Sequence, residues 1–399
     1  MKWLRRNVWR LLTLLASSAA ALGFASERFP DAASYLTRLS PILSLLGAIS
    51  ARAWLGWSML LGVPLLILSF FRGRAFCWRI CPVGLVTETA GKLNPWGRTL
   101  IKRIPPLNKA LLFIITVTAA CGYPLLIWMD PLCMFNGFFA ALRTPFTIVS
   151  GAIGLAFATV ILLSILIPNV WCHRLCPLGG LQETMALLAG MLRRKDSGQG
   201  GAPMESAPAV TRRTLLAAVP AATAGIVASR AFGPNGRKAL RPPGADLDRI
   251  NALCARCGNC MQACPYQLIQ PDIGESGIDG FFTPVVKFRS HNPDQEQYCF
   301  QDCTKCSQAC PTGALRPITV EEKKRTPIGI AVVDHKKCIA WENNEYCAVC
   351  DEYCPFKAIK LVKRKDVMCP IVEADKCRGC GACESACPAE PIAIVIKPI

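Results

Sequence analysis

The stretch Cys254-Ala-Arg-Cys257-Gly-Asn-Cys260-Met-Gln-Ala-Cys264-Pro265 recurs near the end of the chain as Cys377-Arg-Gly-Cys380-Gly-Ala-Cys383-Glu-Ser-Ala-Cys387-Pro388. Both runs follow C-x2-C-x2-C-x3-C-P. With this spacing, three thiolates on a tight loop ligate one [4Fe–4S] cluster and the fourth cysteine ligates a neighbouring cluster. Two similar runs with a longer first gap lie between them: Cys299, Cys303, Cys306 and Cys310, then Cys338, Cys347, Cys350 and Cys354. The sixteen cysteines therefore predict four [4Fe–4S] clusters in two coupled pairs.

Zinc sites and disulfides are the alternatives for cysteines placed this densely. Zinc sites built from C-x2-C pairs do not need a third cysteine three residues on, nor the trailing C-x3-C-P. Disulfide geometry suits few bridges between such close neighbours. We therefore interpret all sixteen as iron ligands. Cys369 also precedes a proline, but it has no partner at ligand spacing and is predicted to be a bystander.

Charge and hydropathy divide the 399-residue chain into two halves. The net charge is +18, and the whole excess of Lys and Arg lies within residues 1–240, between long apolar stretches. A basic surface can bind nucleic acid, but basic residues placed between apolar segments are better explained by membrane topology. We therefore expect no nucleic-acid partner.

Four apolar stretches predict transmembrane helices. They are Val8–Phe24, Trp54–Phe71, Lys109–Met129 and Phe146–Val170. Basic residues gather at the N-terminus and within 72–109 and 171–213, which the positive-inside rule places in the cytoplasm. A cleaved signal peptide is the alternative for the first stretch. The predicted fold is an α-helical integral membrane domain, with four spans plus a fifth linking span, followed by an α+β polyferredoxin domain made of two bacterial ferredoxin-like units.

The segment between the two halves contains Thr211-Arg212-Arg213-Thr214-Leu215-Leu216, which is similar to a twin-arginine export signal. Twin-arginine export carries folded cargo, which suits a domain whose clusters are built in the cytoplasm. A chance Arg-Arg at a cytoplasmic helix end is the alternative. The predicted domains are a four-helix membrane domain at 1–195, a linker at 196–210, a fifth transmembrane segment at 211–231, and a periplasmic four-cluster domain at 240–399. The predicted location is the bacterial inner membrane, with several spans and a cytoplasmic N-terminus.

A repeat inside the first half carries four more cysteines. Cys77-Trp-Arg-Ile-Cys81-Pro82 is matched by Cys172-His-Arg-Leu-Cys176-Pro177, and the match extends to Glu88-Thr89 and Glu183-Thr184. Each pair stands where a proline opens a helix, and helix N-termini lower the pKa of thiols. The four thiols could hold a fifth cluster, act as a redox dithiol system, or be free cysteines in a duplicated helix start. We predict that Cys77, Cys81, Cys172 and Cys176 form a catalytic redox site. Cys121 is predicted to serve packing, and Cys133 is a weaker candidate for the electron path.

The first half resembles the NapH family, membrane quinol dehydrogenase subunits of periplasmic nitrate reductase systems, on the strength of its two C-x3-C-P motifs. The chain from Thr211 onward is similar to NapG and MauM proteins, which have a twin-arginine leader and four [4Fe–4S] motifs. The chain reads as a fusion of the two, although it lacks the cytoplasmic ferredoxin motifs of NapH. The resemblance also implies that the outer two cysteine runs share one cluster pair and the inner two the other.

The resemblance implies a quinol dehydrogenase. Electrons would pass from the membrane quinone pool through four [4Fe–4S] clusters to a periplasmic c-type cytochrome or reductase, and further membrane redox subunits are conceivable partners. The alternative is a maturation factor, similar to MauM, that supplies electrons for the assembly of a periplasmic redox enzyme.

Overall fold

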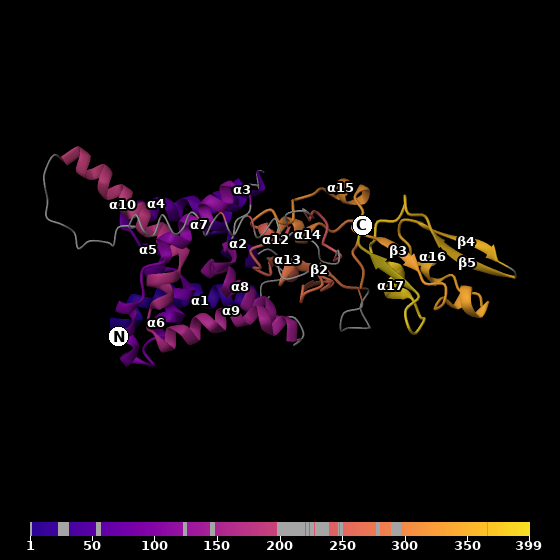
Figure 1. Cartoon of the computed structure of the whole chain (residues 1–399), viewed down its shortest axis with the longest axis horizontal. Coiled ribbons are helices and arrows are strands. Elements are labelled where there is room, and N and C mark those ends of the chain that lie inside the picture. The colour runs from indigo at the N-terminus through magenta and orange to yellow at the C-terminus, as the bar shows by residue number, and fades with distance from the viewer. Residues whose placement is uncertain are drawn as a thin grey trace. The chain divides into compact units, whose positions relative to one another are not determined.

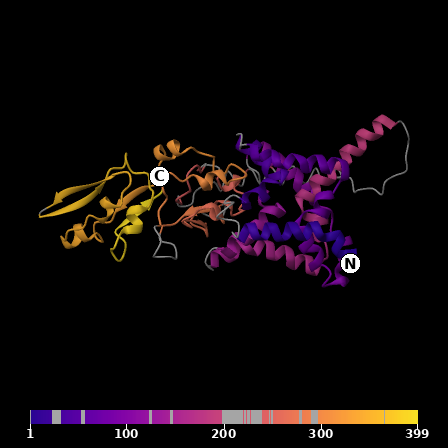
Figure 2. The same cartoon turned by 180° about the vertical axis from the view of Figure 1, so that it is seen from behind.

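A computed structural model describes most of the chain, which divides into two compact units (Figures 1 and 2). The described residues are 2–22, 32–52, 57–122, 126–143, 148–197, 239–245, 250–276, 280–288, 297–364 and 366–399, with 220, 223, 227 and 247. The helical unit comprises Met1–Gly233, Asn251–Asn259 and Pro311–Ala314. The cysteine-rich unit comprises Pro234–Ile250, Cys260–Cys310 and Leu315–Ile399. The predicted linker at 196–210 and the predicted segment at 211–231 lie almost wholly outside the described residues.

The helical unit is a set of helices that pack around one apolar core. Its elements are α1 (Lys2–Leu22), α2 (Ala32–Arg38), η1 (Ile42–Leu46), α3 (Gly47–Ala51), η2 (Trp57–Gly62), α4 (Val63–Arg72), α5 (Ala75–Arg79), α6 (Pro82–Ala90), η3 (Pro95–Arg103), α7 (Asn108–Ala120), η4 (Ile127–Met129), α8 (Pro131–Arg143), α9 (Ile148–Leu166), η5 (Trp171–Leu175) and α10 (Pro177–Ser197). Helix α8 packs on α9, and α1 packs on α6. Phe76, Ile115 and Phe135 are fully buried in the core.

The helices around the duplicated motif pack reciprocally. Helix α4, which precedes the first cysteine pair, packs on α10, which follows the second pair. Helix α9 precedes the second pair and packs on α6, which follows the first. Each half of the repeat therefore contributes one helix to the packing of the other half.

The predicted integral membrane domain is wrong for the part of the chain that the structure describes. No helix in the described ranges is both long enough and apolar enough to cross a membrane. Within the second predicted span, the described residues form the 3-10 helix η2 and the α-helix α4, which has only 10 residues. The third contains α7, which has 13 residues and is followed by a turn at Gly122, where φ is 87°. A spanning helix needs about 20 residues.

The cysteine-rich unit combines short helices with three two-stranded antiparallel sheets. Its elements are α13 (Asn259–Ala263), β1 (Ile269–Pro271), β2 (Pro284–Val286), α14 (Lys305–Gln308), α15 (Val320–Arg325), β3 (Ile330–Val333), η7 (Ile339–Asn343), α16 (Val349–Glu352), β4 (Ile359–Arg364), β5 (Val367–Val372), α17 (Ala382–Ala386) and β6 (Ile394–Lys397). Strand β1 pairs with β2, β3 with β6, and β4 with β5. The β3–β6 pairing joins the chain before the third cysteine run to the chain after the fourth, so these two runs lie together.

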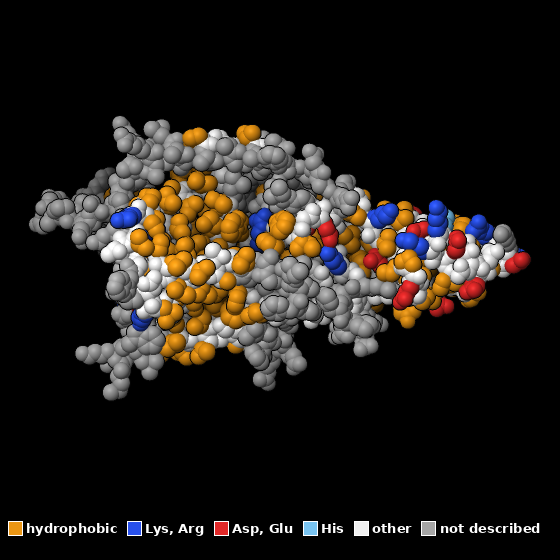
Figure 3. Space-filling view, turned by 60° about the horizontal axis from the view of Figure 1, so that its bottom comes forward, with side chains coloured by type: hydrophobic (Ala, Val, Ile, Leu, Met, Phe, Trp, Pro, Cys, Tyr) orange, Lys and Arg blue, Asp and Glu red, His pale blue; other side chains and the backbone are white. Residues whose placement is uncertain are grey.

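The surfaces of the two units differ in character. Figure 3 shows hydrophobic side chains gathered over the helices and charged side chains of both signs over the cysteine-rich end. Exposed apolar residues of α4 and α9 include Ile67, Phe71, Leu155 and Leu162. The helical unit therefore presents apolar surface to its surroundings.

Candidate iron–sulfur sites

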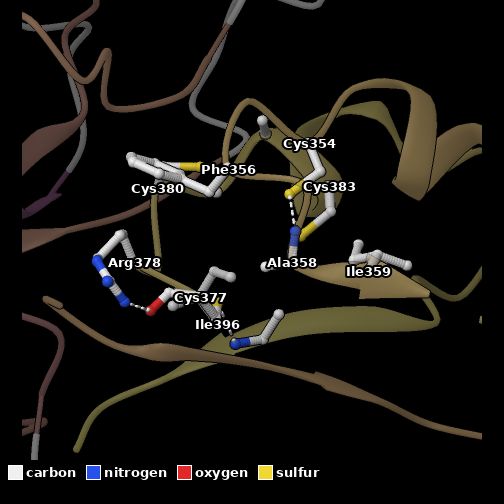
Figure 4. A pocket seen from close by; sticks show the side chains of 12 residues that line it. Cys354, Phe356, Ala358, Ile359, Cys377, Arg378, Cys380, Cys383 and Ile396 are labelled. Atoms are coloured by element: carbon white, nitrogen blue, oxygen red, sulfur yellow. Dashed lines mark hydrogen bonds between the residues drawn. The ribbon is translucent and has the colours of Figure 1, made fainter. Parts of the chain in front are cut away.

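The third and fourth cysteine runs enclose two cavities, each lined by cysteines of both runs. One cavity is lined by Cys377, Cys380 and Cys383 of the fourth run and by Cys354, the last cysteine of the third run (Figure 4). Helix α17 holds Cys383, and Cys354 follows α16. Three cysteines of one loop and one cysteine of a partner run are the ligand set of a bacterial [4Fe–4S] pair.

The second cavity has the reciprocal composition. It is lined by Cys338, Cys347 and Cys350 of the third run and by Cys387, the last cysteine of the fourth. The last cysteine of each run therefore lines the cavity formed by the other run. This exchange couples the two sites, because neither loop supplies all four ligands for its own site.

The second run forms a comparable group with the last cysteine of the first. Burial raises the pKa of Cys299 and of Cys306, and negative charge on Cys264 raises both further. The thiol of Cys264 therefore lies close to both. Lys323 stands beside this group, where its Nζ donates hydrogen bonds of 2.5 Å to the carbonyl oxygens of Phe300 and Cys303. Its positive charge lowers the pKa of Cys299 and so favours the thiolate that iron requires.

These groups correct the implied pairing of the cysteine runs. The resemblance implied that the outer runs pair with each other and the inner runs with each other. The structure instead joins the last cysteine of the first run to the second run, and joins the third run to the fourth. Equal motif spacing in the outer runs therefore does not determine the pairing, which depends on the strand pairings between consecutive runs.

The donors around these cavities fit a [4Fe–4S] cluster. Each cavity is lined by four cysteines, and in a cubane each of four thiolates binds a different iron. Backbone N–H groups also point at the sulfurs: Ala331 donates to Cys377 Sγ at 3.4 Å and Ala358 to Cys354 Sγ at 3.3 Å. Such bonds stabilise thiolates that carry cluster charge.

Burial keeps these thiols protonated when no iron is bound. Burial is the main cause that raises the pKa of Cys350 and of Cys380 to about 12 each, and charge on neighbouring cysteines adds to it. A thiol with such a pKa is a poor nucleophile near neutral pH. Iron must displace the proton to bind, so cluster binding releases protons. These cysteines are therefore suited to cluster ligation and not to covalent catalysis.

The four cysteines of the duplicated motif also meet in one place, inside the helical unit. Burial raises the pKa of Cys81 and Cys176, and negative charge on Cys77 and Cys172 raises both further. The expectation that the helix N-termini would lower these pKa values is wrong. Backbone N–H groups at the start of α6 do lower the pKa of Cys81, but burial outweighs them.

Each half of this four-cysteine site contacts a cysteine of the other half. Thr87 Oγ1 of the first copy lies 3.3 Å from Cys172 Sγ of the second copy. Gln182, which stands at the matching position of the second copy, hydrogen-bonds the thiol of Cys77 in the first. Polar side chains at matched positions therefore bind thiols across the repeat. Neither residue belongs to a ligand motif, but their matched positions in the repeat are a signal that the sequence contains.

A buried arginine, Arg10, and a half-buried arginine, Arg74, complete the four-cysteine site. Arg10 of α1 pairs with Glu88 at 2.6 Å, and Arg74 pairs with Glu183 at 2.6 Å. Arg74 also donates to the carbonyl oxygen of Cys172 at 3.1 Å. Both arginines lower the pKa of Cys77 and Cys172 and so partly offset the cost of thiolate burial. This role was not predictable from the sequence, because no local motif marks either arginine.

Three further cysteines lie outside the ligand runs and the duplicated motif, and one histidine, His173, lies inside the second copy of that motif. Cys121 is exposed after α7, and Cys369 is buried and donates from Sγ to the carbonyl oxygen of Ala340 at 3.4 Å. Burial and the charge of Arg74 lower the pKa of His173, so its ring is neutral near pH 7. Cys133 is buried and hydrogen-bonds the thiol of Cys257 in the first run.

Family models for iron–sulfur domains match both halves of the chain. A 4Fe-4S binding domain matches residues 54–105 and 149–196, which contain all four cysteines of the duplicated motif. A 4Fe-4S dicluster domain matches 253–314, and a further 4Fe-4S binding domain matches 370–389. Together with the cysteine-lined cavities, these matches define the class: the chain is a ferredoxin-type iron–sulfur electron-transfer protein.

The curated relatives give the family. A methylamine utilization ferredoxin-type protein MauM of Methylorubrum extorquens is 37% identical over 172 residues, which cover 40% of this chain and 73% of the relative. Ferredoxin-type protein NapG of Escherichia coli K12 is 34% identical over 171 residues, covering 40% of this chain and 71% of NapG. The chain belongs to this family of MauM and NapG ferredoxin-type proteins. No solved structure matches it.

Proposed function

We propose that the chain oxidises a quinol and passes the electrons through its iron–sulfur clusters to a periplasmic redox protein. The observation that carries the proposal is that one polypeptide contains both a four-cysteine site in the helical unit and four predicted cluster sites after it. A ferredoxin domain that only relays electrons does not need the four-cysteine site. A protein that accepts electrons at one site and delivers them from another does need it.

The four-cysteine site is the proposed point of electron entry, and it would hold a fifth [4Fe–4S] cluster. The match of an iron–sulfur family model to both halves of the repeat supports a cluster over a dithiol. A cluster with four thiolates is anionic, and Arg10 and Arg74 supply opposite charge beside it. The resemblance of residues 1–195 to NapH, and the exposed apolar surface of α4 and α9, support approach by an apolar quinol.

Within the cysteine-rich unit, a short link joins the two pairs of sites. The backbone N–H of Cys299 donates to the carbonyl oxygen of Cys380 at 2.8 Å. Both residues line a cavity with Lys323 and Arg378, so ligands of different pairs stand beside one another. A direct hydrogen bond between ligand residues is a short path for electron transfer between the pairs.

The proposed acceptor is a periplasmic c-type cytochrome or reductase. The twin-arginine-like stretch at 211–216, which lies outside the described residues, supports export of the cluster domain, and NapG and MauM are ferredoxin-type relatives. Fractionation of cells that express the full chain tests this location. Protection of the cluster domain from protease added to spheroplasts would contradict it.

The central test is an iron assay and EPR of the anaerobically purified full chain, before and after addition of a reduced quinone analogue. About twenty irons per chain, with cubane signals that grow on quinol addition, are expected for five clusters. About sixteen irons would leave the duplicated motif without a cluster and favour a dithiol there. A full iron load that quinol cannot reduce would overturn quinol oxidation and favour a role in maturation of a partner enzyme.

A further inference from the structure

Helix α8 presents a buried cysteine that belongs to none of the four ligand runs. Asp130 caps the start of this helix: its Oδ1 accepts from the backbone N–H of Leu132 at 2.9 Å and of Cys133 at 3.3 Å. Ser40 Oγ donates to the other carboxylate oxygen at 2.6 Å. Asp130 and Ser40 are both fully buried, and Cys133 is 1% exposed. The position of the Cys133 thiol is therefore fixed by the cap and by the surrounding core.

The loop at 251–259, which carries the first cysteines of the first run, is fitted onto the same face of α8. Asn136 Nδ2 donates to the carbonyl oxygen of Cys257 at 2.8 Å and to Asn259 Oδ1 at 2.5 Å. Asn259 in turn donates to Thr37 Oγ1 at 2.8 Å. At Gly258, where φ is 74°, a Cβ atom would lie 2.5 Å from Cβ of Ala140. A glycine is thus needed for this close approach, and Cys257 is part of the helical unit's core.

The approach brings two thiols together, because Cys133 and Cys257 belong to the same buried core of the helical unit. Burial raises the pKa of Cys133, and a side-chain hydrogen bond between the two thiols raises it further and lowers the pKa of Cys257. As an iron ligand Cys257 is a thiolate, which has no proton and can only accept. Cys133 must then be the donor.

We propose that Cys133 is a positioning residue for electron transfer: its S–H donates to the cluster-ligating sulfur of Cys257 and raises the reduction potential of the first cluster. Reduction adds negative charge to the cluster and its sulfurs, so a donor at a ligand sulfur stabilises the reduced form more than the oxidised form. The inference rests on the proposed function in one respect, that the first run holds a cluster. It adds a specific role for a residue outside every ligand motif.

The test is a redox titration followed by EPR on the full chain, purified anaerobically, in wild type and two variants. Cys133→Ala removes the donor, whereas Cys133→Ser keeps one. At a fixed potential near the midpoint, the ratio of reduced to oxidised first cluster should fall roughly threefold to tenfold in Cys133→Ala, since an S–H is a weak donor. A tenfold change corresponds to about 59 mV for a one-electron couple. Cys133→Ser should retain the wild-type ratio or exceed it. Cys121→Ser, which replaces an exposed cysteine, is the control and should leave the ratio unchanged.

The readouts separate this inference from the proposed function. Equal iron in all variants with the expected order of ratios supports the donor role. Equal iron with the same ratio in Cys133→Ala and wild type overturns the donor role, and leaves the cluster assignment intact. A loss of about four irons in both Cys133 variants also overturns it, because Cys133 would then be needed for cluster binding itself. Absence of a first-cluster signal in wild type would overturn the underlying cluster assignment.

Discussion

Replacement of one ligand cysteine in the cysteine-rich unit should remove one cluster. Cys383 lines the cavity shared with Cys354, Cys377 and Cys380. Replacement of Cys383 with Ala should lower the iron content by about four per chain and destabilise the cysteine-rich unit, because metal binding and folding are coupled. Iron analysis with thermal unfolding measures both effects.

The control for this variant is Cys369→Ala, which removes a buried thiol that lines neither cavity. Its iron content should equal that of the wild type. An undiminished iron content in Cys383→Ala would refute the ligand assignment.

Cys172 should be needed for electron entry but not for the clusters of the cysteine-rich unit. It belongs to the four-cysteine site of the helical unit, where Thr87 and Arg74 contact it. Cys172→Ala should abolish cluster reduction by a quinol analogue, while dithionite still reduces the clusters of the cysteine-rich unit. Stopped-flow absorbance with each reductant separates the two. Loss of dithionite-reducible clusters in this variant would instead indicate that Cys172 is needed for folding.

Site residues were predictable from the sequence where they belong to one short motif. The sixteen run cysteines and the duplicated motif follow from spacing alone. Arg10 and Arg74 did not, because they reach the four-cysteine site from elements remote in sequence from their partners Glu88 and Glu183. The high pKa of Cys77 was also missed, since burial depends on neighbours that a motif does not specify.

At the scale of elements, the start of α17 depends on one glycine. Gly381 precedes this helix with φ at 84°, and a Cβ atom there would lie 2.2 Å from the ring of Phe288. Gly381→Ala should therefore lower the free energy of unfolding by about 1–3 kcal/mol, from backbone strain and overpacking. It should also weaken iron loading at the neighbouring Cys380 and Cys383. Denaturant unfolding and iron analysis measure both effects.

A matched control for this change lies in the middle of α10. A Cβ atom at Gly190 would meet nothing within 4 Å. Gly190→Ala should raise stability by up to about 1 kcal/mol, because alanine favours a helix interior. If both alanine variants behaved alike, the close contact at Gly381 would not be the cause.

The prediction of membrane spans from hydropathy was wrong because the apolar stretches contain helix ends. The average hydropathy of a stretch does not show where a helix ends within it. The predicted stretch from Lys109 to Met129 contains a turn at Gly122 and a separate 3-10 helix, η4. The predicted stretch Trp54–Phe71 contains the 3-10 helix η2 ahead of α4. Which cysteine runs share a pair of cluster sites was also not predictable from the sequence. It depends on the β3–β6 pairing, which joins segments far apart in the chain.

At the scale of the whole molecule, the stability of the iron-free protein should fall at alkaline pH. Burial raises the pKa of Cys350 and Cys380 from 9.0 to about 12 in the folded chain. A raised pKa contributes stability that is fully present below pH 9 and is lost as the pH rises toward 12. The urea midpoint of iron-free protein should therefore be lower at pH 10.5 than at pH 8.

The iron-loaded protein provides the comparison, because its ligand thiols have already lost their protons to iron binding. Its urea midpoint should change less between the same two pH values. Equal alkaline sensitivity of both forms would show that the buried thiols are not responsible.

The reciprocal packing of the duplicated motif has an evolutionary consequence. Each copy supplies two cysteines, one arginine-bound glutamate and one polar side chain that reaches the thiol of the other copy. One copy alone offers two thiolates, too few for a cubane. An ancestor with a single copy could have completed the site only by association with a second identical chain. In a single chain that carries both copies, what would be an interface between two chains is the interior of one. The two copies can then differ from each other, as they do at the matched positions Thr87 and Gln182.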